Sequence, residues 1–243
     1  MNGSRVGTQH VSNEPKRSHP MAKLIAIEGI DGSGKGTQAR ILVDGLRQSG
    51  RKVELISFPR YGETFFGRLI GSFLNGEYGT LDQVHPMLVS LLFAGDRLES
   101  RPKIEQALAT CNVVVLDRYV ASNVAHQGAK LSDANRETLC RSIEHVEYTL
   151  YGMPRPDQVI LLDLRVSVAQ ILVSKKATRN YTDRTADIQE ADGAYLERVR
   201  QQYLELAGRE SNWSVVECEG TGGLRSVDEI AWDVRQVVDR AVR

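Results

Sequence analysis

Residues 23–38 have the sequence Lys-Leu-Ile-Ala-Ile-Glu-Gly-Ile-Asp-Gly-Ser-Gly-Lys-Gly-Thr-Gln, in which a short apolar run leads directly into a glycine-rich turn. The glycines at 29 and 34 and the lysine at 35 have the spacing G-x-x-x-x-G-K of a phosphate-binding loop. Glycines let backbone N–H groups close around a phosphate, and the N-terminus of the following helix adds partial positive charge. We therefore predict that the triphosphate of a nucleotide binds to Gly29, Ile30, Asp31, Gly32, Ser33, Gly34, Lys35, Gly36 and Thr37.

The residue after Lys35 departs from this motif. A Ser or Thr hydroxyl normally follows the lysine and binds Mg²⁺. Here Gly36 takes that position, and the hydroxyl comes one residue later, at Thr37. We expect the metal to be held more through water and through a carboxylate elsewhere in the chain.

Short apolar runs alternate with longer amphipathic stretches along the chain. The runs are continuously apolar, as expected for parallel strands that are covered on both faces. This alternation predicts a three-layer α/β/α P-loop NTPase fold with a five-stranded parallel sheet, whose ligands gather at the carboxyl ends of the strands. The predicted strands are 23–28, 52–57, 112–117, 158–163 and 214–217, and the predicted helices are 36–49, 84–108, 133–148, 168–175, 190–208 and 227–242. Ser132 and Ser226 are the expected N-caps of the third and last helices.

Composition excludes several classes of protein. The 243 residues include 31 Lys+Arg and 31 Asp+Glu, and a net charge of zero argues against a nucleic-acid binder. The three cysteines, Cys111, Cys140 and Cys218, lack the spacing of a zinc site or a disulfide framework. No apolar run suggests a membrane span or a signal peptide, so we expect a cytoplasmic protein. Residues 1–21 are predicted to be a disordered tail, and 22–243 to be one domain.

Two strand ends carry further candidate site residues. Asp117 ends the third strand and Arg118 follows it, where they could hold Mg²⁺ and contact phosphate, although a surface turn explains them equally well. Asp163 ends the fourth strand, and for it we favour a structural role.

Aromatic and basic side chains form a second group of candidates. Phe58, Arg60 and Tyr61 follow the second strand and could clamp an anion. Phe93 and Arg97 lie four apart in a helix, so they could stack on a base and bond its edge, although an aromatic at helical spacing is more often part of the core. The basic segment 175–187 has the character either of a lid or of a solvated charge run.

These pieces together resemble the thymidylate kinase family over residues 22–242. The motifs stand in the family's order. They are Ile-Glu-Gly-Ile-Asp-Gly-Ser-Gly-Lys at 27–35, Phe-Pro-Arg-Tyr-Gly at 58–62, Leu-Phe-Ala-Gly-Asp-Arg at 92–97, Asp-Arg-Tyr-Val-Ala-Ser-Asn at 117–123, Pro-Asp at 156–157 before the Leu-Leu-Asp strand, and Val-Arg-Gln-Gln-Tyr at 199–203. The block at 117–123 is the most specific of them.

The resemblance implies ATP- and Mg²⁺-dependent phosphorylation of dTMP to dTDP in dTTP biosynthesis, by a homodimer. The runner-up is a P-loop kinase for another nucleoside monophosphate or a deoxynucleoside, and a third possibility is a regulatory nucleotide-binding module. The resemblance implies that Lys35 and Thr37 bind the ATP phosphates and that Asp117 and Glu190 bind the metal. It implies that Arg118 contacts the dTMP phosphate, that Phe93 stacks on thymine and that Arg97 bonds the edge of the base. The other residues that it implies around dTMP are Asp31 near the 3′-hydroxyl, Phe58, Arg60 and Tyr61 at the acceptor site, and Asn123, His126 and Gln127 around the sugar and base.

Two departures from the family pattern concern catalysis. Gly32 stands where some members carry an arginine, which implies that the catalytic arginine comes from the lid, as Arg179 or Arg184. The segment Asp-Ile-Gln-Glu at 187–190 keeps the acids of the family's Asp-Arg-x-Glu pattern but lacks its arginine.

Overall fold

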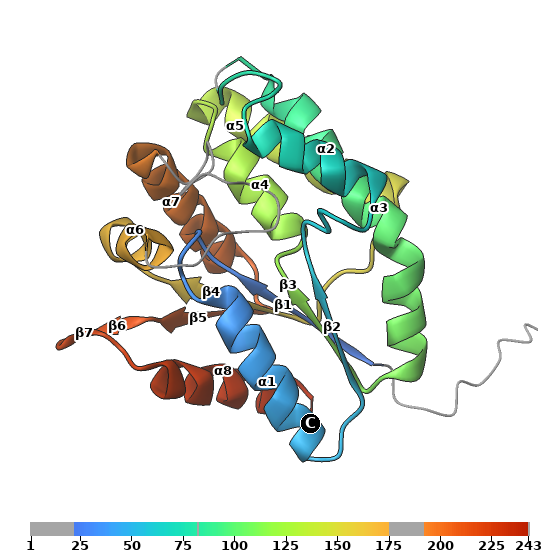
Figure 1. The fold of residues 1–243 in the computed structure, drawn as a ribbon, viewed down its shortest axis with the longest axis vertical. Coiled ribbons are helices and arrows are strands. Elements are labelled where there is room, and N and C mark those ends of the chain that lie inside the picture. Colours follow the sequence, from blue (N-terminus) through green and yellow to red (C-terminus); the bar gives the residue numbers. More distant parts are fainter. Residues whose placement is uncertain (1–21, 82, 175–191, 243) are drawn as a thin grey trace, which may run out of the picture.

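A computed structural model describes residues 22–81, 83–174 and 192–242. Five parallel strands form one sheet in the order β2-β3-β1-β4-β5 (Figure 1). Their bounds are β1 Lys23–Glu28, β2 Val53–Ser57, β3 Val113–Asp117, β4 Gln158–Asp163 and β5 Trp213–Glu217. The predicted strands are confirmed to within one residue at each end. The central strands β1, β3 and β4 are almost wholly buried, whereas the edge strands β2 and β5 are partly exposed. Strand β1 lies at the centre, so the loop that follows it emerges in the middle of the carboxyl edge.

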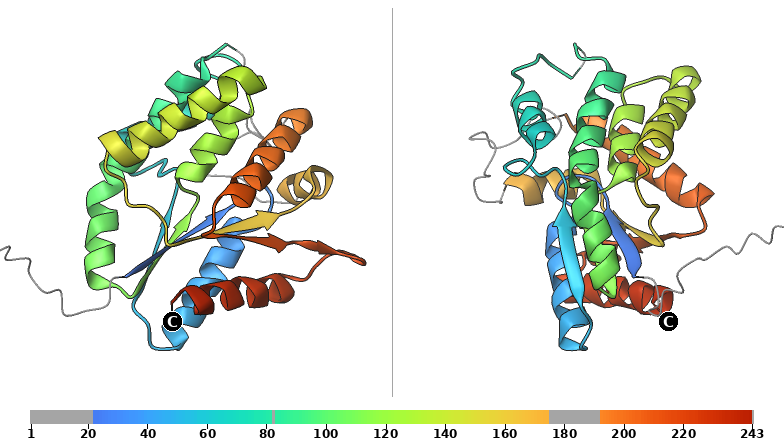
Figure 2. Two further views of the ribbon diagram at one scale, coloured as in Figure 1. Left: turned by 180° about the vertical axis from the view of Figure 1, so that it is seen from behind. Right: turned by 90° about the vertical axis from the view of Figure 1, so that its right-hand side faces the viewer.

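Helices cover both faces of the sheet (Figure 2). On one face lie α1 (Lys35–Gln48) and α8 (Val227–Ala241). The opposite face is covered mainly by α3 (Pro86–Thr110), α4 (Val120–Gly128) and α7 (Gly193–Arg209). The remaining elements are α2 (Phe65–Leu74), α5 (Asp133–Glu144), α6 (Val166–Ser174), a π-helical turn η1 (His145–Leu150) and a hairpin of β6 (Glu219–Gly220) and β7 (Gly223–Leu224). The arrangement confirms the three-layer α/β/α prediction.

Two large apolar clusters pack against the sheet, and a third, smaller one lies between α2 and α3. In β1, Ile25 and Ile27 pack with α1 and α8, whereas Leu24 and Ala26 pack with the helices of the other face. All four side chains are at most 1% exposed. Alternate residues therefore enter different layers, which explains why the strands are continuously apolar.

Several local elements differ from those predicted. Helices α2 and α4 were not predicted, because both are short and α4 lies among polar pocket residues. The predicted helix 133–148 ends as an α-helix at Glu144 and continues as the π-turn η1. The segment 1–21 and the whole of the predicted lid, 175–187, lie outside the described residues. None of the described helices is long and apolar enough to cross a membrane.

The two predicted helix caps have different outcomes. Ser226 forms a capping box with Glu229, in which its hydroxyl accepts from the Glu229 N–H at 3.2 Å and the Glu229 carboxylate accepts from the Ser226 N–H at 2.8 Å. Ser132 is the N-cap of α5, as predicted, but its side chain makes no capping hydrogen bond within the described structure. The sequence distinguishes the two sites at the third helical position, where Ser226 is followed by Glu229 but Ser132 is followed by Asn135, so only the first has the residues of a capping box.

We expect Ser226→Ala to lower the free energy of unfolding by about 1 kcal/mol, because it leaves N–H groups of α8 without an acceptor. Ser132→Ala is the matched control and should cost only about a few tenths of that energy. Urea unfolding of both variants measures the difference. Equal losses in the two variants would contradict the assignment.

Candidate functional site

The loop after β1 has the backbone shape of a phosphate cradle. Gly34 has φ 90° and directly precedes α1, and Gly32 has φ 86°, both in the left-handed region that favours glycine. A Cβ on Gly32 would lie 2.4 Å from the carbonyl oxygen of Ala169 in α6. No side chain fits at this position without displacing α6, so the loop itself has no room for an arginine there.

Lys35 lies at the start of α1 and is buried in the loop. Its Nζ donates to the carbonyl of Ile30 at 2.7 Å. Burial, together with the nearby charge of Arg118, lowers the pKa of Lys35 to about 8. A phosphate bound in the loop would place negative charge beside this amine and so favour its charged form.

Arg118 links the loop to the pocket beside it. Its guanidinium pairs with Asp31 and donates to Ser122 Oγ at 3.2 Å and to the Gly29 carbonyl at 3.3 Å. Burial favours the neutral carboxyl of Asp31, but the charge of Arg118 outweighs it and holds the pKa of Asp31 well below its usual range. Arg118 has φ 67°, a left-handed conformation that a non-glycine residue rarely adopts. A charged arginine is thus held between the phosphate loop and the adjoining pocket.

A pocket opens next to this arginine, at the carboxyl edge of the sheet. Most of the predicted acceptor residues line it, contributed by the β2–α2 connection, α3 and α4. The lining includes Asp31, Phe58, Tyr61, Phe93, Arg97, Arg118, Asn123, His126 and Gln127, together with Pro59, Leu74 and Ser122. Arg60 is placed differently in the described structure: its guanidinium bonds Ser100 Oγ at 2.9 Å and pairs with Glu63, outside the pocket wall.

Helix α4 presents polar groups to this pocket. Three of its buried atoms, Asn123 Oδ1, His126 Nε2 and Gln127 Nε2, have no hydrogen-bond partner among the described residues. Buried polar groups are normally paired, because an unpaired one costs about 1–3 kcal/mol. Three of them on one wall of one pocket indicate a polar ligand.

The protonation of His126 follows from its neighbour in α7. The hydroxyl of Tyr195 donates to the His126 carbonyl at 3.0 Å and also lies 3.0 Å from His126 Nδ1. Since that hydroxyl has one proton, Nδ1 must donate to it, which leaves Nε2 as an acceptor. Burial, reinforced by the charge of Arg118, lowers the pKa of His126 to about 3, so the ring is neutral.

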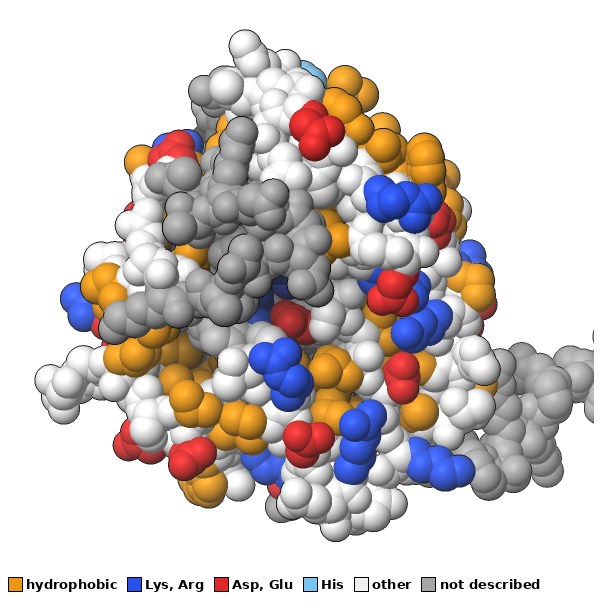
Figure 3. All heavy atoms as spheres, viewed as in Figure 1, with side chains coloured by type: hydrophobic (Ala, Val, Ile, Leu, Met, Phe, Trp, Pro, Cys, Tyr) orange, Lys and Arg blue, Asp and Glu red, His pale blue; other side chains and the backbone are white. Residues whose placement is uncertain are grey.

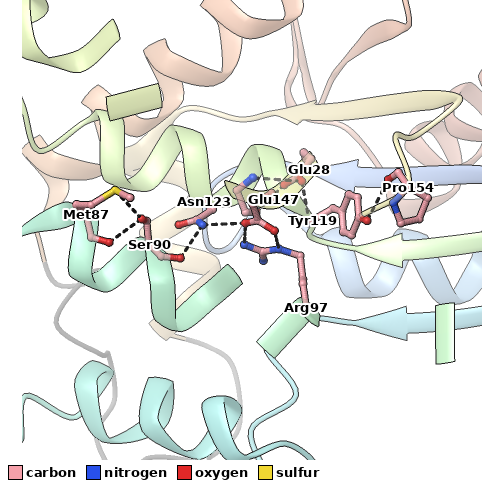
Figure 4. Close-up of polar contacts among 9 residues, drawn as sticks. Glu28, Met87, Ser90, Arg97, Tyr119, Asn123, Glu147 and Pro154 are labelled. Atoms are coloured by element: carbon pink, nitrogen blue, oxygen red, sulfur yellow. Dashed lines mark hydrogen bonds and ion pairs between the residues drawn. The ribbon is translucent and has the colours of Figure 1, made fainter. Parts of the chain in front are cut away.

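One of the residues that line the pocket, Arg97, forms an ion pair with a buried acid behind the pocket wall. Arg97 in α3 is 2% exposed, and its Nε donates to Glu147 Oε2 at 2.8 Å while its Nη2 pairs with the other carboxylate oxygen (Figure 4). Burial alone would lower the pKa of Arg97, but Glu147 raises it, so the guanidinium stays charged. Phe93 lies one turn earlier on α3 and lines the same pocket.

The donors for a metal ion are few. In the described ranges, no group of three His, Cys, Asp or Glu side chains could hold a metal by itself. Asp117 ends β3, and a Cβ on Gly36 would lie 3.1 Å from its Oδ2, so the missing side chain leaves space between this carboxylate and the loop. One carboxylate beside a phosphate site suits Mg²⁺, which keeps several waters and binds phosphate oxygens. Glu190, Arg179 and Arg184 lie outside the described residues and stay predictions.

The family model for thymidylate kinase matches residues 27–222. The chain belongs to the thymidylate kinase family.

Individual thymidylate kinases resemble the chain over most of its length. It is 36% identical to the thymidylate kinase of Mycobacterium tuberculosis (strain CDC 1551 / Oshkosh), over 79% of this chain and 90% of that protein. Identity to the human thymidylate kinase is 30%, over 90% and 91% of the two chains. A solved thymidylate kinase structure from Candida albicans, an enzyme of broad substrate specificity, superposes with a TM-score of 0.68 at 25% identity and covers 92% of this chain and 94% of that one.

Two residues that support the pocket of this thymidylate kinase family member from behind were not predicted as site residues from the sequence. Glu147 has no strand end or motif to mark it, and only the fold brings it to Arg97. Tyr203 stands in a family motif, but its bond to Glu28 Oε2 at 3.1 Å connects residues 175 apart. Asp163 does have the structural role that we favoured, because it pairs with Arg200 in α7 at 2.7 Å.

His126 generates a prediction for stability. Its folded pKa of about 3 lies below the unfolded value of about 6.5, so acid protonates the unfolded chain first. The contribution of His126 to stability therefore falls as the pH falls below about 6.5. The difference in unfolding free energy between the wild-type protein and His126→Gln should change by about 2 kcal/mol between pH 7 and pH 5. A difference that stays constant over this range, in urea titrations, would show that the ring is not buried and neutral.

Proposed function

We propose that the protein transfers the γ-phosphoryl group of ATP to the 5′-phosphate of dTMP, giving dTDP and ADP. The observation that carries this proposal is the pocket beside the phosphate loop, with Arg118 at one end and the base-sized cluster of Phe93, Arg97 and Asn123 at the other. A monophosphate nucleotide has the same two ends, an anion and a flat ring. Family membership supports the same reaction.

The polar groups at the base end match a thymine. Asn123 Nδ2 donates to the Ser90 carbonyl at 3.0 Å and to Glu147 Oε1 at 2.9 Å, so its unpaired Oδ1 is an acceptor for the ligand. Thymine offers an N3–H donor and an O4 acceptor. We assign the N3–H to Asn123 Oδ1 and O4 to Arg97 Nη1, the guanidinium nitrogen that is not bonded to Glu147, with Phe93 stacking on the ring.

The phosphate end needs alignment more than proton transfer. The second pKa of a phosphate monoester is about 6, so the attacking oxygen of dTMP is already ionised near neutral pH and requires no strong base. Arg118 positions that phosphate, and Lys35 with the amides of residues 29–37 holds the phosphates of ATP. Catalysis is then mainly orientation together with stabilisation of charge on the transferring group.

Magnesium is part of the proposal. Asp117 would hold it beside the loop, with water and phosphate oxygens completing its coordination. When bound, the ion neutralises charge on the ATP phosphates. A catalytic arginine from the predicted lid, Arg179 or Arg184, and a second acid, Glu190, stay predictions.

The cellular setting is proposed on chemical grounds. Cys111, Cys140 and Cys218 are free thiols. Free thiols in a nucleotide-metabolising enzyme fit a reducing compartment, so we propose that the protein acts in the cytoplasm, where it supplies the precursor of dTTP.

The reaction is tested with a panel of monophosphates in a coupled ADP-release assay. We expect dTMP to be the preferred acceptor over dUMP, dCMP and AMP. Lys35→Ala should fold and lose at least about a hundredfold in kcat, since a charged donor on the transferring phosphates is gone. Lys23→Ala, which removes an exposed lysine paired with Asp157, is its matched control and should keep normal turnover. Preference for AMP would reverse the assignment of the substrate.

We also propose a homodimer, formed through α2 and α3. Exposed apolar side chains gather there, seen along the upper right edge of the surface in Figure 3. They include Phe65, which is 56% exposed, and Leu88, which is 61% exposed. Within α3, Leu88 faces outward, whereas Phe93 lines the pocket.

Leu88→Glu should shift the protein from dimer to monomer in sedimentation analysis at micromolar concentration, because it places a charge in an apolar contact. Leu150→Glu provides the control, since Leu150 is equally exposed at 64% but lies on η1. A wild-type monomer, or a dimer that Leu88→Glu leaves intact, would refute this interface.

A further inference from the structure

Glu147 is a buried carboxylate that does not line the substrate pocket yet contacts two residues that do. It lies in the π-turn η1 and is 0% exposed. Backbone bonds from Tyr151 N–H to the Val146 carbonyl at 2.8 Å and from Met153 N–H to the Glu147 carbonyl at 2.9 Å hold the chain around it. π-Helical turns are rare and are frequent at functional sites.

Both contacts of this carboxylate act on groups that recognise the base. Two of its bonds fix the guanidinium of Arg97, and a third, from Asn123 Nδ2, is made by Oε1 (Figure 4). An ionised carboxylate only accepts hydrogen bonds. It therefore fixes which end of the Asn123 amide faces it, with help from the Ser90 carbonyl, which also only accepts.

We propose that Glu147 is the positioning residue that sets thymine over cytosine. This inference rests on the proposed function and adds the origin of its base specificity. With Nδ2 turned toward Glu147, Asn123 presents an acceptor to the pocket, while Arg97 presents a donor. Thymine complements both, with N3–H and O4, whereas cytosine offers an N3 acceptor to an acceptor and an amino donor to a donor.

An amide in place of this carboxylate would weaken that constraint. The Gln side chain has one acceptor oxygen and one NH₂ donor, whereas the site needs acceptors at both oxygens. In one orientation its NH₂ opposes the Arg97 Nε–H, and in the other it opposes Arg97 Nη2 and Asn123 Nδ2. At least one of the two base-recognising groups then loses its fixed direction, and cytosine meets less opposition.

The test compares kcat/KM for dTMP and for dCMP in wild-type, Glu147→Gln and Glu147→Asp proteins. For Glu147→Gln, we expect the dTMP/dCMP ratio to fall by about tenfold or more. Glu147→Asp keeps only acceptors and the charge that Arg97 requires, so it should lose rate but keep the ratio. This second variant also makes the test independent of whether Gln at 147 permits folding.

Glu144→Gln is the matched control, since it makes the same chemical change one turn earlier, in a residue that lines a different cavity, beside Tyr148 and Arg155. Its ratio should equal that of the wild-type protein. A Glu147→Gln protein with an unchanged ratio, or a Glu147→Asp protein that loses the ratio, would overturn the role of Glu147. A wild-type protein that does not prefer dTMP would instead refute the proposed function.

Discussion

The carboxylate of Glu28 is the interaction on which the geometry of the site depends. It is the last residue of β1, and the phosphate loop begins at the next residue. Its oxygens accept from the N–H groups of Tyr119 at 2.8 Å and Ser122 at 3.3 Å, and from the Ser122 hydroxyl at 2.6 Å. In the described structure α4 has no side-chain cap from its own N-terminus, so Glu28 caps it from the sheet.

Through this cap, Glu28 fixes the two predicted ligand sites relative to each other. The phosphate loop begins at Gly29, directly after Glu28, and the capped helix α4 carries the pocket residues Asn123, His126 and Gln127. Arg118 lies between them and donates to the Ser122 hydroxyl that Glu28 also holds. Burial raises the pKa of Glu28, while the donors around the carboxylate and the charge of Arg118 oppose that rise. A buried carboxylate with four donors is the kind of network that fixes one arrangement of its neighbours.

Local sequence patterns predicted the frame of the site. The strands and the phosphate loop follow from apolar runs and glycine spacing, which depend on neighbouring residues alone. Phe93 and Arg97 were correctly placed on one helix face because a helix repeats every 3.6 residues. The carboxyl edge of a parallel sheet then brings these separate segments together.

The interior connections could not be predicted in this way. Glu28 and Glu147 are buried acids whose partners lie 91 and 50 residues away along the chain, and no local pattern indicates such pairs. Arg60 lies next to two pocket residues, but its guanidinium turns to Ser100 and Glu63, because side-chain direction depends on packing. Ser132 shows the same limit, since it occupies the N-cap position of α5 but its side chain makes no capping hydrogen bond.

A crystal structure with dTMP and a non-hydrolysable ATP analogue tests the central claim most directly. The account predicts thymine against Phe93 with its N3 near Asn123 Oδ1, the monophosphate at Arg118, and the triphosphate wrapped by residues 29–37. It would be contradicted by dTMP bound away from α4, or by a triphosphate that makes no contact with the loop after β1.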